Sequence, residues 1–343
     1  MNPLIPFLIS FFAAYLSTPL LRKIAIKFNV VDIPNHRKIH GNPVPLLGGL
    51  AIYIAVIAGL LFDLTVLRLM SGILAGGTII FIIGLIDDVR GLSAPIKLAG
   101  QFIAALIMVY LGVRISFLPN NLTGYTGEVV LTLIWVTGIT NAVNYLDGID
   151  GLAAGSTAVS ALFFAIIAYL TNQPLIGLIA LILIAGCLGF LPHNFKQAKI
   201  FLGDAGSTFI GFMLAGIAVL GNWAEDNVVS LSIPVLILGV PIFDMTFTTI
   251  MRIREKKIGT IIEWLKYGGK DHFHHRLIDL GLRPTGAVFF IYFVIIALGI
   301  SAVIISNAKE TFEGIWAILQ AAIIFGAIAV LMVIGARRRS GWG

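Results

Sequence analysis

Stretches of about 18 to 20 residues with few or no charged side chains recur along the whole chain. A hydrocarbon core about 30 Å thick requires an apolar helix of this length to cross it. Only 12% of the 343 residues are charged, whereas soluble domains carry roughly 25%. The sequence therefore predicts an all-α polytopic membrane protein, with residues 1–343 forming a single integral membrane domain.

The apolar windows predict about eleven transmembrane helices, an odd number that places the two termini on opposite sides of the membrane. Of the 23 Lys and Arg residues, only Arg68, Arg114 and Lys309 fall on the side of the N-terminus. Basic residues favour the cytoplasmic side, so we expect the N-terminus outside and the C-terminus in the cytoplasm. The expected helices lie near residues 3–21, 44–62, 66–86, 94–112, 128–143, 152–170, 174–191, 206–221, 229–250, 285–306 and 314–335.

Five carboxylates stand at expected cytoplasmic helix ends: Asp87 and Asp88 in GLIDDVRGL, Asp147 and Asp150 in NYLDGIDGL, and Asp204 in FLGDAGST. If these groups converged without cations, they would repel one another and take up protons. Their number therefore predicts a divalent metal ion acting together with nearby basic residues. Oxygen and amide ligands favour Mg²⁺, with Mn²⁺ as a substitute, and Mg²⁺ in proteins commonly also binds substrate phosphates.

Each carboxylate motif also has a simpler interpretation. Asp87 and Asp88 could form a solvated helix end with Arg90 as counter-ion, but carboxylates at a helix C-terminus oppose the helix dipole. Asp204 could cap the eighth span. A glycine-lined helix N-terminus can, however, also approach a phosphate closely, and a plain cap does not need the polar Asn194 and the two lysines that follow it.

The segment between the ninth and tenth spans is the longest and most basic connection. Its IIEWLKY stretch is typical of an interfacial helix attracted to anionic headgroups. The following DHFHHRL stretch differs, because His272, His274, His275 and Arg276 are not needed to touch lipid and suit a cationic grip on a diphosphate. Zinc is the alternative ligand, although no HExxH pattern or cysteine supports it.

The first cytoplasmic loop, DIPNHRKIHGNPVPLLGG, combines Lys38 and His40 with prolines and a glycine pair. Attraction to lipid headgroups is the simpler explanation for the basic residues. It does not explain Gly48 and Gly49, which predict close backbone packing beside a site.

Five motifs, in order between residues 32 and 277, resemble the polyprenyl-phosphate N-acetylhexosamine-1-phosphate transferases. This family includes the phospho-MurNAc-pentapeptide translocase and the bacterial undecaprenyl-phosphate GlcNAc-1-phosphate transferases. The HFHHRLIDLGL stretch resembles the histidine motif of the GlcNAc-1-phosphate branch. The matching motifs are RKIHGNPVPLLGG, GLIDDVRGLSA, NAVNYLDGIDGLAAG, the stretch from Asn194 to FLGDAGS, and HFHHRL.

The resemblance implies an enzyme of the cytoplasmic membrane with its active site facing the cytoplasm. It would transfer GlcNAc-1-phosphate from a UDP-sugar to undecaprenyl phosphate, release UMP, and start a lipid-linked glycan such as teichoic acid or lipopolysaccharide. Its partners would be the UDP-N-acetylhexosamine, the polyprenyl phosphate and membrane lipids, without nucleic acid, and a homodimer is an open alternative. A phospho-MurNAc-pentapeptide transferase and an ion-coupled transporter are the other functions considered. Transport carboxylates usually lie near the membrane midplane, unlike these helix-end residues.

Roles are carried over motif by motif from the resemblance. Asn144 and Asp204 would bind Mg²⁺, and Asp87 and Asp88 would be catalytic residues at the lipid phosphate. The loops that would form the active site are 22–43, 87–93, 144–151, 192–205 and 251–284. The substrate-binding residues would be Lys38, His40, Asp147, Asp150, Asn194, Phe201, His272, His274, His275 and Arg276, with Asp147 and Asp150 near the nucleotide and Phe201 on the uracil.

Overall fold

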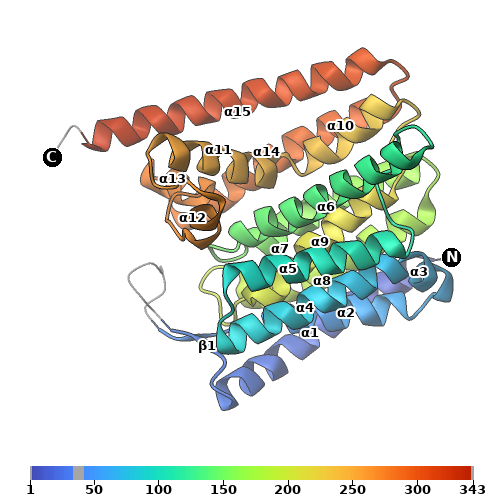
Figure 1. Ribbon diagram of the computed structural model, residues 1–343. Helices are drawn as coiled ribbons and strands as arrows, with labels where there is room; N and C mark the ends of the chain where they lie inside the picture. Colours follow the sequence, from blue (N-terminus) through green and yellow to red (C-terminus); the bar gives the residue numbers. More distant parts are fainter. Residues whose placement is uncertain (1, 34–41, 341–343) are drawn as a thin grey trace. The chain divides into compact units, whose positions relative to one another are not determined.

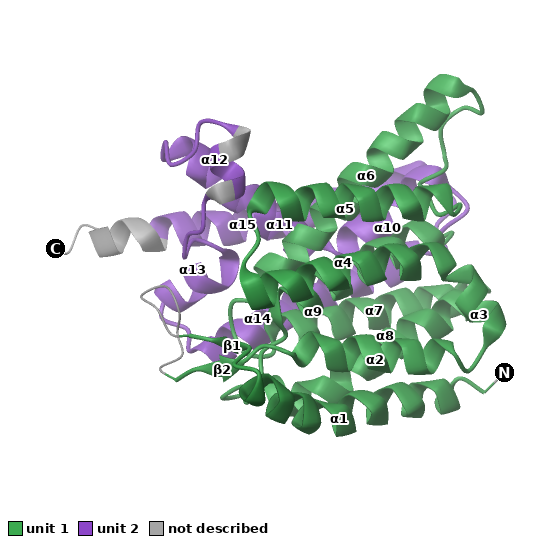
Figure 2. Cartoon of the chain, turned by 60° about the horizontal axis from the view of Figure 1, so that its bottom comes forward, with its two compact units in different colours: residues 1–222 green, residues 223–343 purple. Residues whose placement is uncertain are grey.

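A computed structural model describes residues 2–33 and 42–340, and this part of the chain is mostly helical (Figure 1). The predicted all-α class is therefore confirmed. The chain divides into two compact units, residues 1–222 and residues 223–343 (Figure 2).

Unit 1 is a bundle of long apolar helices, several of which begin at a residue suited to a helix start. The Asn121 side chain accepts a hydrogen bond from the backbone N–H of Gly124 and so caps α6, and Pro174 opens α8. The helices are α1 (Leu4–Lys27), α2 (Gly48–Leu60), α3 (Leu64–Leu69), α4 (Ser71–Arg90), α5 (Ala94–Tyr110), α6 (Leu122–Tyr145), α7 (Leu152–Leu170), α8 (Pro174–Asn194) and α9 (Gly203–Leu220).

Helix α9 lies at the centre of unit 1 and packs against α2, α4, α6 and α7. Its first turn, GDAGST, carries only short side chains, so neighbouring backbones approach it closely. A Cβ atom on Gly84 of α4 would lie 2.6 Å from the backbone nitrogen of Ala205, and one on Gly49 of α2 would overlap the backbone of Gly206. The predicted close packing at the glycine pair of LLGG is therefore confirmed.

A short antiparallel ladder precedes α2. Strand β1 (Val31–Asp32) pairs with β2 (Val44–Pro45), with Val31 opposite Pro45. The backbone of Phe201 donates to the Pro45 carbonyl at 2.8 Å and accepts from the Gly48 N–H at 2.9 Å. These contacts fix the segment before α9 against the start of α2.

Unit 2 contains a sharply bent helix pair. Helices α10 and α11 meet at Leu238 with an angle of 75°, where the sequence predicted one continuous span over 229–250. Pro234 inside α10 and Gly239 at the start of α11 are the residue types that break helices. The helices of this unit are α10 (Asn227–Ile237), α11 (Gly239–Arg254), α12 (Ile261–Lys266), α13 (Phe273–Asp279), α14 (Pro284–Ile305) and α15 (Thr311–Ser340).

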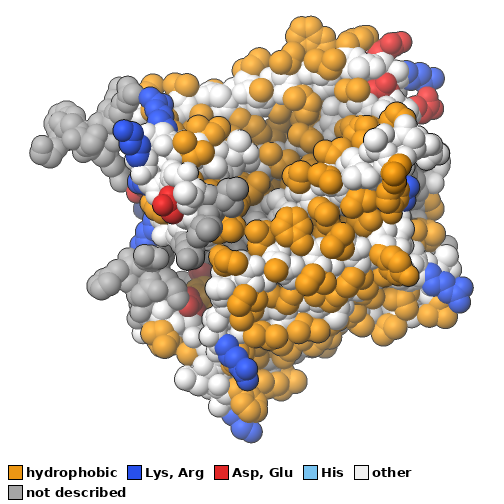
Figure 3. Space-filling view, viewed as in Figure 1, with side chains coloured by type: hydrophobic (Ala, Val, Ile, Leu, Met, Phe, Trp, Pro, Cys, Tyr) orange, Lys and Arg blue, Asp and Glu red, His pale blue; other side chains and the backbone are white. Residues whose placement is uncertain are grey.

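Large apolar side chains cover the outer sides of the long helices. Leu16 of α1, Phe293 of α14 and Ile323 of α15 are each about two-thirds exposed or more (67%, 68% and 73%). On the face drawn in Figure 3, hydrophobic side chains spread over the helix sides, whereas Lys and Arg gather at helix ends. Such apolar exposure suits a lipid environment.

Every region expected to cross the membrane coincides with a helix or a helix pair. Within the described residues, eight helices are long and apolar enough to span a membrane, and the α10–α11 pair would make nine. Helices α2 and α5 are apolar but shorter. A multi-pass membrane protein is confirmed, whereas the count of eleven spans stays a prediction.

Candidate active site

The C-terminal end of α4 meets the N-terminal end of α9 through Asp88. The Asp88 carboxylate accepts hydrogen bonds from the backbone N–H groups of Asp204 at 2.8 Å and Ala205 at 3.1 Å. It thus caps α9 from another helix, where the sequence alternative placed Asp204 itself as the cap. Gly203 has φ +73°, and a Cβ atom there would collide with the Asp88 carboxylate.

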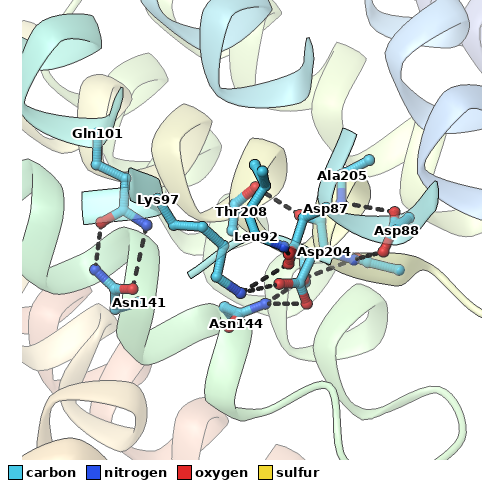
Figure 4. A network of polar contacts seen from close by, with 12 residues as sticks. Asp87, Asp88, Leu92, Lys97, Gln101, Asn141, Asn144, Asp204, Ala205 and Thr208 are labelled. Atoms are coloured by element: carbon cyan, nitrogen blue, oxygen red, sulfur yellow. Dashed lines mark hydrogen bonds and ion pairs between the residues drawn. The ribbon is translucent and has the colours of Figure 1, made fainter. Parts of the chain in front are cut away.

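Lys97, near the start of α5, joins the two other carboxylates of this region. Its Nζ donates to Asp87 Oδ2 at 2.7 Å and to Asp204 Oδ2 at 2.6 Å (Figure 4). The other oxygen of Asp87 accepts from the backbone N–H of Leu92, at 2.5 Å. One ammonium group therefore holds together two carboxylates that would otherwise repel each other.

Asn144 reaches the same carboxylate from the end of α6. Its Nδ2 donates to Asp204 Oδ1 at 3.2 Å and to the Ser207 hydroxyl at 2.7 Å. The Ser207 hydroxyl in turn donates to the Gly203 carbonyl at 2.8 Å. The two residues predicted to bind metal are therefore hydrogen-bonded to each other, beside Asp87 and Lys97.

Asp147 and Asp150 lie in the turn between α6 and α7. The pKa of Asp147 is raised well above its ordinary value, because its carboxyl is desolvated and lies in the field of Asp204 and Asp88. Asp150 accepts a hydrogen bond from the backbone N–H of Ala198 at 2.8 Å. Asp150 thus ties this turn to the loop before α9, while its predicted contact with a nucleotide stays a prediction.

Asn194 is buried between the same two loops. Its Oδ1 accepts from the Gly151 N–H and its Nδ2 donates to the Ile200 carbonyl, both at 3.0 Å. Phe201 is half-buried, and its backbone pairs with the segment at the start of α2. The structure therefore gives Asn194 a loop-holding role, and the predicted substrate contacts of both residues stay predictions.

In unit 2 the histidine motif is anchored by Asp244, a fully buried residue of α11. Its Oδ2 lies 3.0 Å from His272 Nδ1, and its Oδ1 accepts from the Phe273 N–H at 2.6 Å. Arg252 forms a bidentate pair with Asp271, at 2.8 and 2.6 Å. Burial alone would raise the pKa of Asp271, but the Arg252 guanidinium outweighs it and lowers that pKa.

The other members of the motif differ in their surroundings. His274 is buried, and neither ring nitrogen has a hydrogen-bond partner among the described residues. Desolvation of the ring lowers the pKa of His274 to about 3, so the side chain is neutral at physiological pH. Burial also lowers the pKa of the half-buried His275. Arg276 donates from Nε to the Asp271 carbonyl at 2.7 Å.

Lys38 and His40 lie outside the described residues, so their predicted role at the phosphates stays a prediction.

The donor set around Asp204 fits a hard divalent cation. The Asp87 and Asp204 carboxylates already converge on one positive charge, and the amide of Asn144 and the hydroxyl of Ser207 add further oxygen atoms. Among the described residues no group of three His, Cys, Asp or Glu side chains is arranged to hold a metal by itself. Mg²⁺ usually takes only one or two protein groups and completes its shell with water and phosphates. The predicted magnesium site stays a prediction.

Several residues of these networks were not predicted from the sequence: Lys97, Ser207, Asp244 and Arg252. Lys97 did carry a signal, because it is the one charged side chain of the apolar helix α5, a placement that marks function in membrane segments. Asp244 follows the apolar start GVPIF of α11, but that helix also carries Arg252 and Arg254.

Fold and site together define a polytopic membrane protein with an acidic, lysine-bridged cluster suited to cations and phosphate groups. A family model described as glycosyl transferase family 4 matches residues 70–222, which include this cluster. A Bacillus subtilis protein, named "probable undecaprenyl-phosphate N-acetylglucosaminyl 1-phosphate transferase", is 38% identical over 96% of this chain and 90% of its own length.

Two further relatives have names that refer to the same kind of transfer. The decaprenyl-phosphate N-acetylglucosaminephosphotransferase of Mycolicibacterium smegmatis is 34% identical, covering 94% of this chain and 86% of that protein. The undecaprenyl-phosphate alpha-N-acetylglucosaminyl 1-phosphate transferase of Salmonella typhi is 28% identical, covering 86% and 79%. The chain belongs to the polyprenyl-phosphate N-acetylglucosamine-1-phosphate transferase family.

Proposed function

We propose that this protein transfers GlcNAc-1-phosphate from UDP-GlcNAc to a polyprenyl phosphate and releases UMP. The observation that carries the proposal is the similarity to an enzyme named for this transfer, at 38% identity over nearly the whole chain. The acidic cluster of unit 1 supports it, because the cluster lies within the segment that matches the family model.

The reaction exchanges one phosphoanhydride bond for another. An oxygen of the lipid phosphate attacks the phosphorus that carries GlcNAc, and the bond from that phosphorus to the UMP oxygen breaks. UMP leaves with the electron pair of that bond, and the product is polyprenyl-diphosphate-GlcNAc. Since the bonds broken and formed are of one type, the reaction is expected to be readily reversible.

The side chains of the cluster divide the work of bringing two anions together. Lys97 supplies a positive charge between Asp87 and Asp204, next to where the phosphates would bind. Asp87 removes the residual proton of the lipid phosphate, whose second pKa is near 6. Asp88 positions the start of α9, because its two oxygens accept from the backbone N–H groups of Asp204 and Ala205.

Asn144 and Asp204 would hold Mg²⁺, with Mn²⁺ as a substitute, beside Asp87 and Lys97. When bound, the ion would neutralise the donor diphosphate and the charge that develops on UMP. Among the predicted substrate-binding residues, Asp147 and Asp150 lie on the turn after α6, the helix that carries Asn144.

The protein would lie in the cytoplasmic membrane with this cluster facing the cytoplasm, where UDP-sugars are available. The charge pattern supports the orientation, since the few basic residues of the opposite loops are Arg68, Arg114 and Lys309.

UMP release tests the proposal. Purified protein in detergent, given UDP-GlcNAc, undecaprenyl phosphate and Mg²⁺, should release one UMP for each lipid-linked sugar formed, and the Asp204→Ala variant should not. UDP-GalNAc and UDP-MurNAc-pentapeptide are the competing donors. A preference for the pentapeptide donor, or no release with any of the three, would overturn the proposal.

A further inference from the structure

A second polar contact lies one helical turn away from the acidic cluster, between α5 and α6. Gln101 Nε2 donates to Asn141 Oδ1 at 3.1 Å, and Asn141 Nδ2 donates back to Gln101 Oε1 at 2.6 Å (Figure 4). Asn141 Nδ2 also donates to the Thr137 carbonyl at 2.8 Å. The two amides form a closed pair, which we call the amide clamp.

The clamp joins two helices that are largely apolar in sequence. Gln101 is only 5% exposed and is followed by the apolar stretch FIAALIMVY, while Asn141 is half-buried. An amide without a partner in such a place is costly, and hydrogen bonds between helices hold membrane bundles together. Two antiparallel bonds between planar groups also fix the rotation and the axial register of α5 against α6.

The spacing connects the clamp to the reaction centre. Lys97 precedes Gln101 by four residues and Asn144 follows Asn141 by three, so each pair shares one face of its helix. Lys97 and Asn144 both donate to the Asp204 carboxylate, at 2.6 and 3.2 Å. A rotation or slip of α5 against α6 would therefore move these two donors apart.

We propose that the amide clamp is a positioning device that holds Lys97 and Asn144 together on Asp204. Gln101 and Asn141 act through these neighbours and do not contact the substrates. This inference rests on the proposed transferase function. Displacement of catalytic groups by about 1 Å can cost roughly 100-fold in rate, so the clamp matters for turnover more than for folding.

The test compares variants that break the clamp with one that rebuilds it. Gln101→Met and Asn141→Leu each remove one amide, and the third variant combines them. The rebuilt clamp is the exchange Gln101→Asn with Asn141→Gln, which keeps two amides and the same total number of methylene groups. Trp135→Phe is the matched control, since it removes another hydrogen bond from α6, the 3.3 Å bond to the Ala215 carbonyl of α9.

Two readouts are needed: kcat for UMP release, and the rise in unfolding temperature caused by Mg²⁺ with UDP-GlcNAc, which reports binding without turnover. Each single variant should lose about 10- to 100-fold in kcat and part of the ligand-induced rise. The kcat of the double variant should be no lower than that of the less active single variant, because the two substitutions remove the same contact. The exchanged pair should recover to within about 5-fold of the wild type.

Trp135→Phe should lower the unfolding temperature yet keep kcat. The proposal is overturned if the single variants keep the wild-type kcat, or if their losses of kcat multiply in the double variant. It is also overturned if the exchanged pair is as inactive as the single variants, a result that would indicate direct contact with a substrate. Any of these three outcomes would contradict the clamp alone, and the proposed function would still hold if the wild type releases UMP. A wild type that releases no UMP would overturn both.

Discussion

Asp204 is the residue on which the polar contacts of unit 1 converge. One carboxylate oxygen accepts from Lys97, the other accepts from Asn144, and its backbone N–H is held by Asp88. Three separate helices thus fix this one residue: α5 and α6 hold its carboxylate and α4 holds its backbone. A substitution at any of the three partners changes the geometry of Asp204 as well as the local charge.

Lys97→Met should reduce UMP release by at least about 100-fold, as is typical when a group that stabilises transition-state charge is removed. The variant loses the ammonium that Asp87 and Asp204 share, so the two carboxylates repel each other. The measurement is the initial rate at saturating substrates. Lys309→Met, which removes an exposed lysine from another loop, should retain wild-type activity. A Lys97→Met rate within 3-fold of the wild type would contradict the assigned role.

His274 should make the stability of the protein depend on pH. Its pKa is about 3 in the folded chain and 6.5 ordinarily, so between these values the unfolded chain binds a proton that the folded chain cannot. Stability contributed by the neutral ring is therefore lost as pH falls below about 6.5. Unfolding temperatures measured from pH 7 to pH 5 should fall more steeply for the wild type than for His274→Leu. Parallel slopes would show that the ring is protonated when folded.

Site residues could be predicted from the sequence where a residue type is unusual for its position in a helix. Carboxylates beside glycines at helix ends identified Asp87, Asp88 and Asp204, which the structure brings together. Lys97 is visible in the sequence as the one charge of α5, but its partner Asp204 lies 107 residues further along the chain. The local sequence therefore does not reveal that the two side chains pair. The clamp residues Gln101 and Asn141 are uncharged, so only their mutual contact distinguishes them.

At the scale of helices, the approach of α2 and α4 to the first turn of α9 depends on glycine. Gly49→Ala would place a methyl group against the backbone of Gly206 and the Leu202 carbonyl. We expect it to destabilise the protein by about 1–3 kcal/mol, as overpacking does, and to reduce UMP release, because α9 carries Asp204. The measurements are unfolding temperature and rate.

Gly326→Ala in α15 is the control for that substitution, since apart from the adjoining residues and backbone of its own helix no described atom lies within 4 Å of the added methyl group. It should leave both quantities unchanged or raise stability slightly. Equal unfolding temperatures and equal rates of UMP release in the two alanine variants would show that close packing at Gly49 is not needed for the stability or activity of the site.

The length of each apolar stretch predicted that a helix would form there. It did not predict where a helix would be interrupted. The expected span over 66–86 begins instead as a separate short helix, α3, capped by Asp63 before α4 starts at Ser71. The α10–α11 break was missed although Pro234 and Gly239 are visible in the sequence. Proline and glycine are tolerated in membrane helices when neighbours satisfy the backbone, so their presence alone does not predict a 75° bend.

For the whole molecule, the bent pair decides on which side of the membrane residues 255–283 lie. Helix α10 has 11 residues and would rise about 17 Å, too short for a core about 30 Å thick, whereas both helices together are long enough. If the pair crosses the membrane, this segment with its histidine motif faces the cytoplasm and the C-terminus does too. If the pair re-enters on the same side, both are outside.

Cysteines added one at a time distinguish these topologies in intact cells treated with a membrane-impermeant thiol reagent. The native Cys187 is buried, so the parent chain should remain unlabelled and serve as the control. Asn120→Cys, exposed between α5 and α6, should react from outside, while Arg254→Cys, exposed at the end of α11, should react only after permeabilisation. This outcome follows from the positive-inside rule, because the 255–283 segment is the most basic loop of the chain. Labelling of Arg254→Cys in intact cells would instead make α10–α11 a re-entrant pair and would separate the histidine motif from the cytoplasmic UDP-sugar.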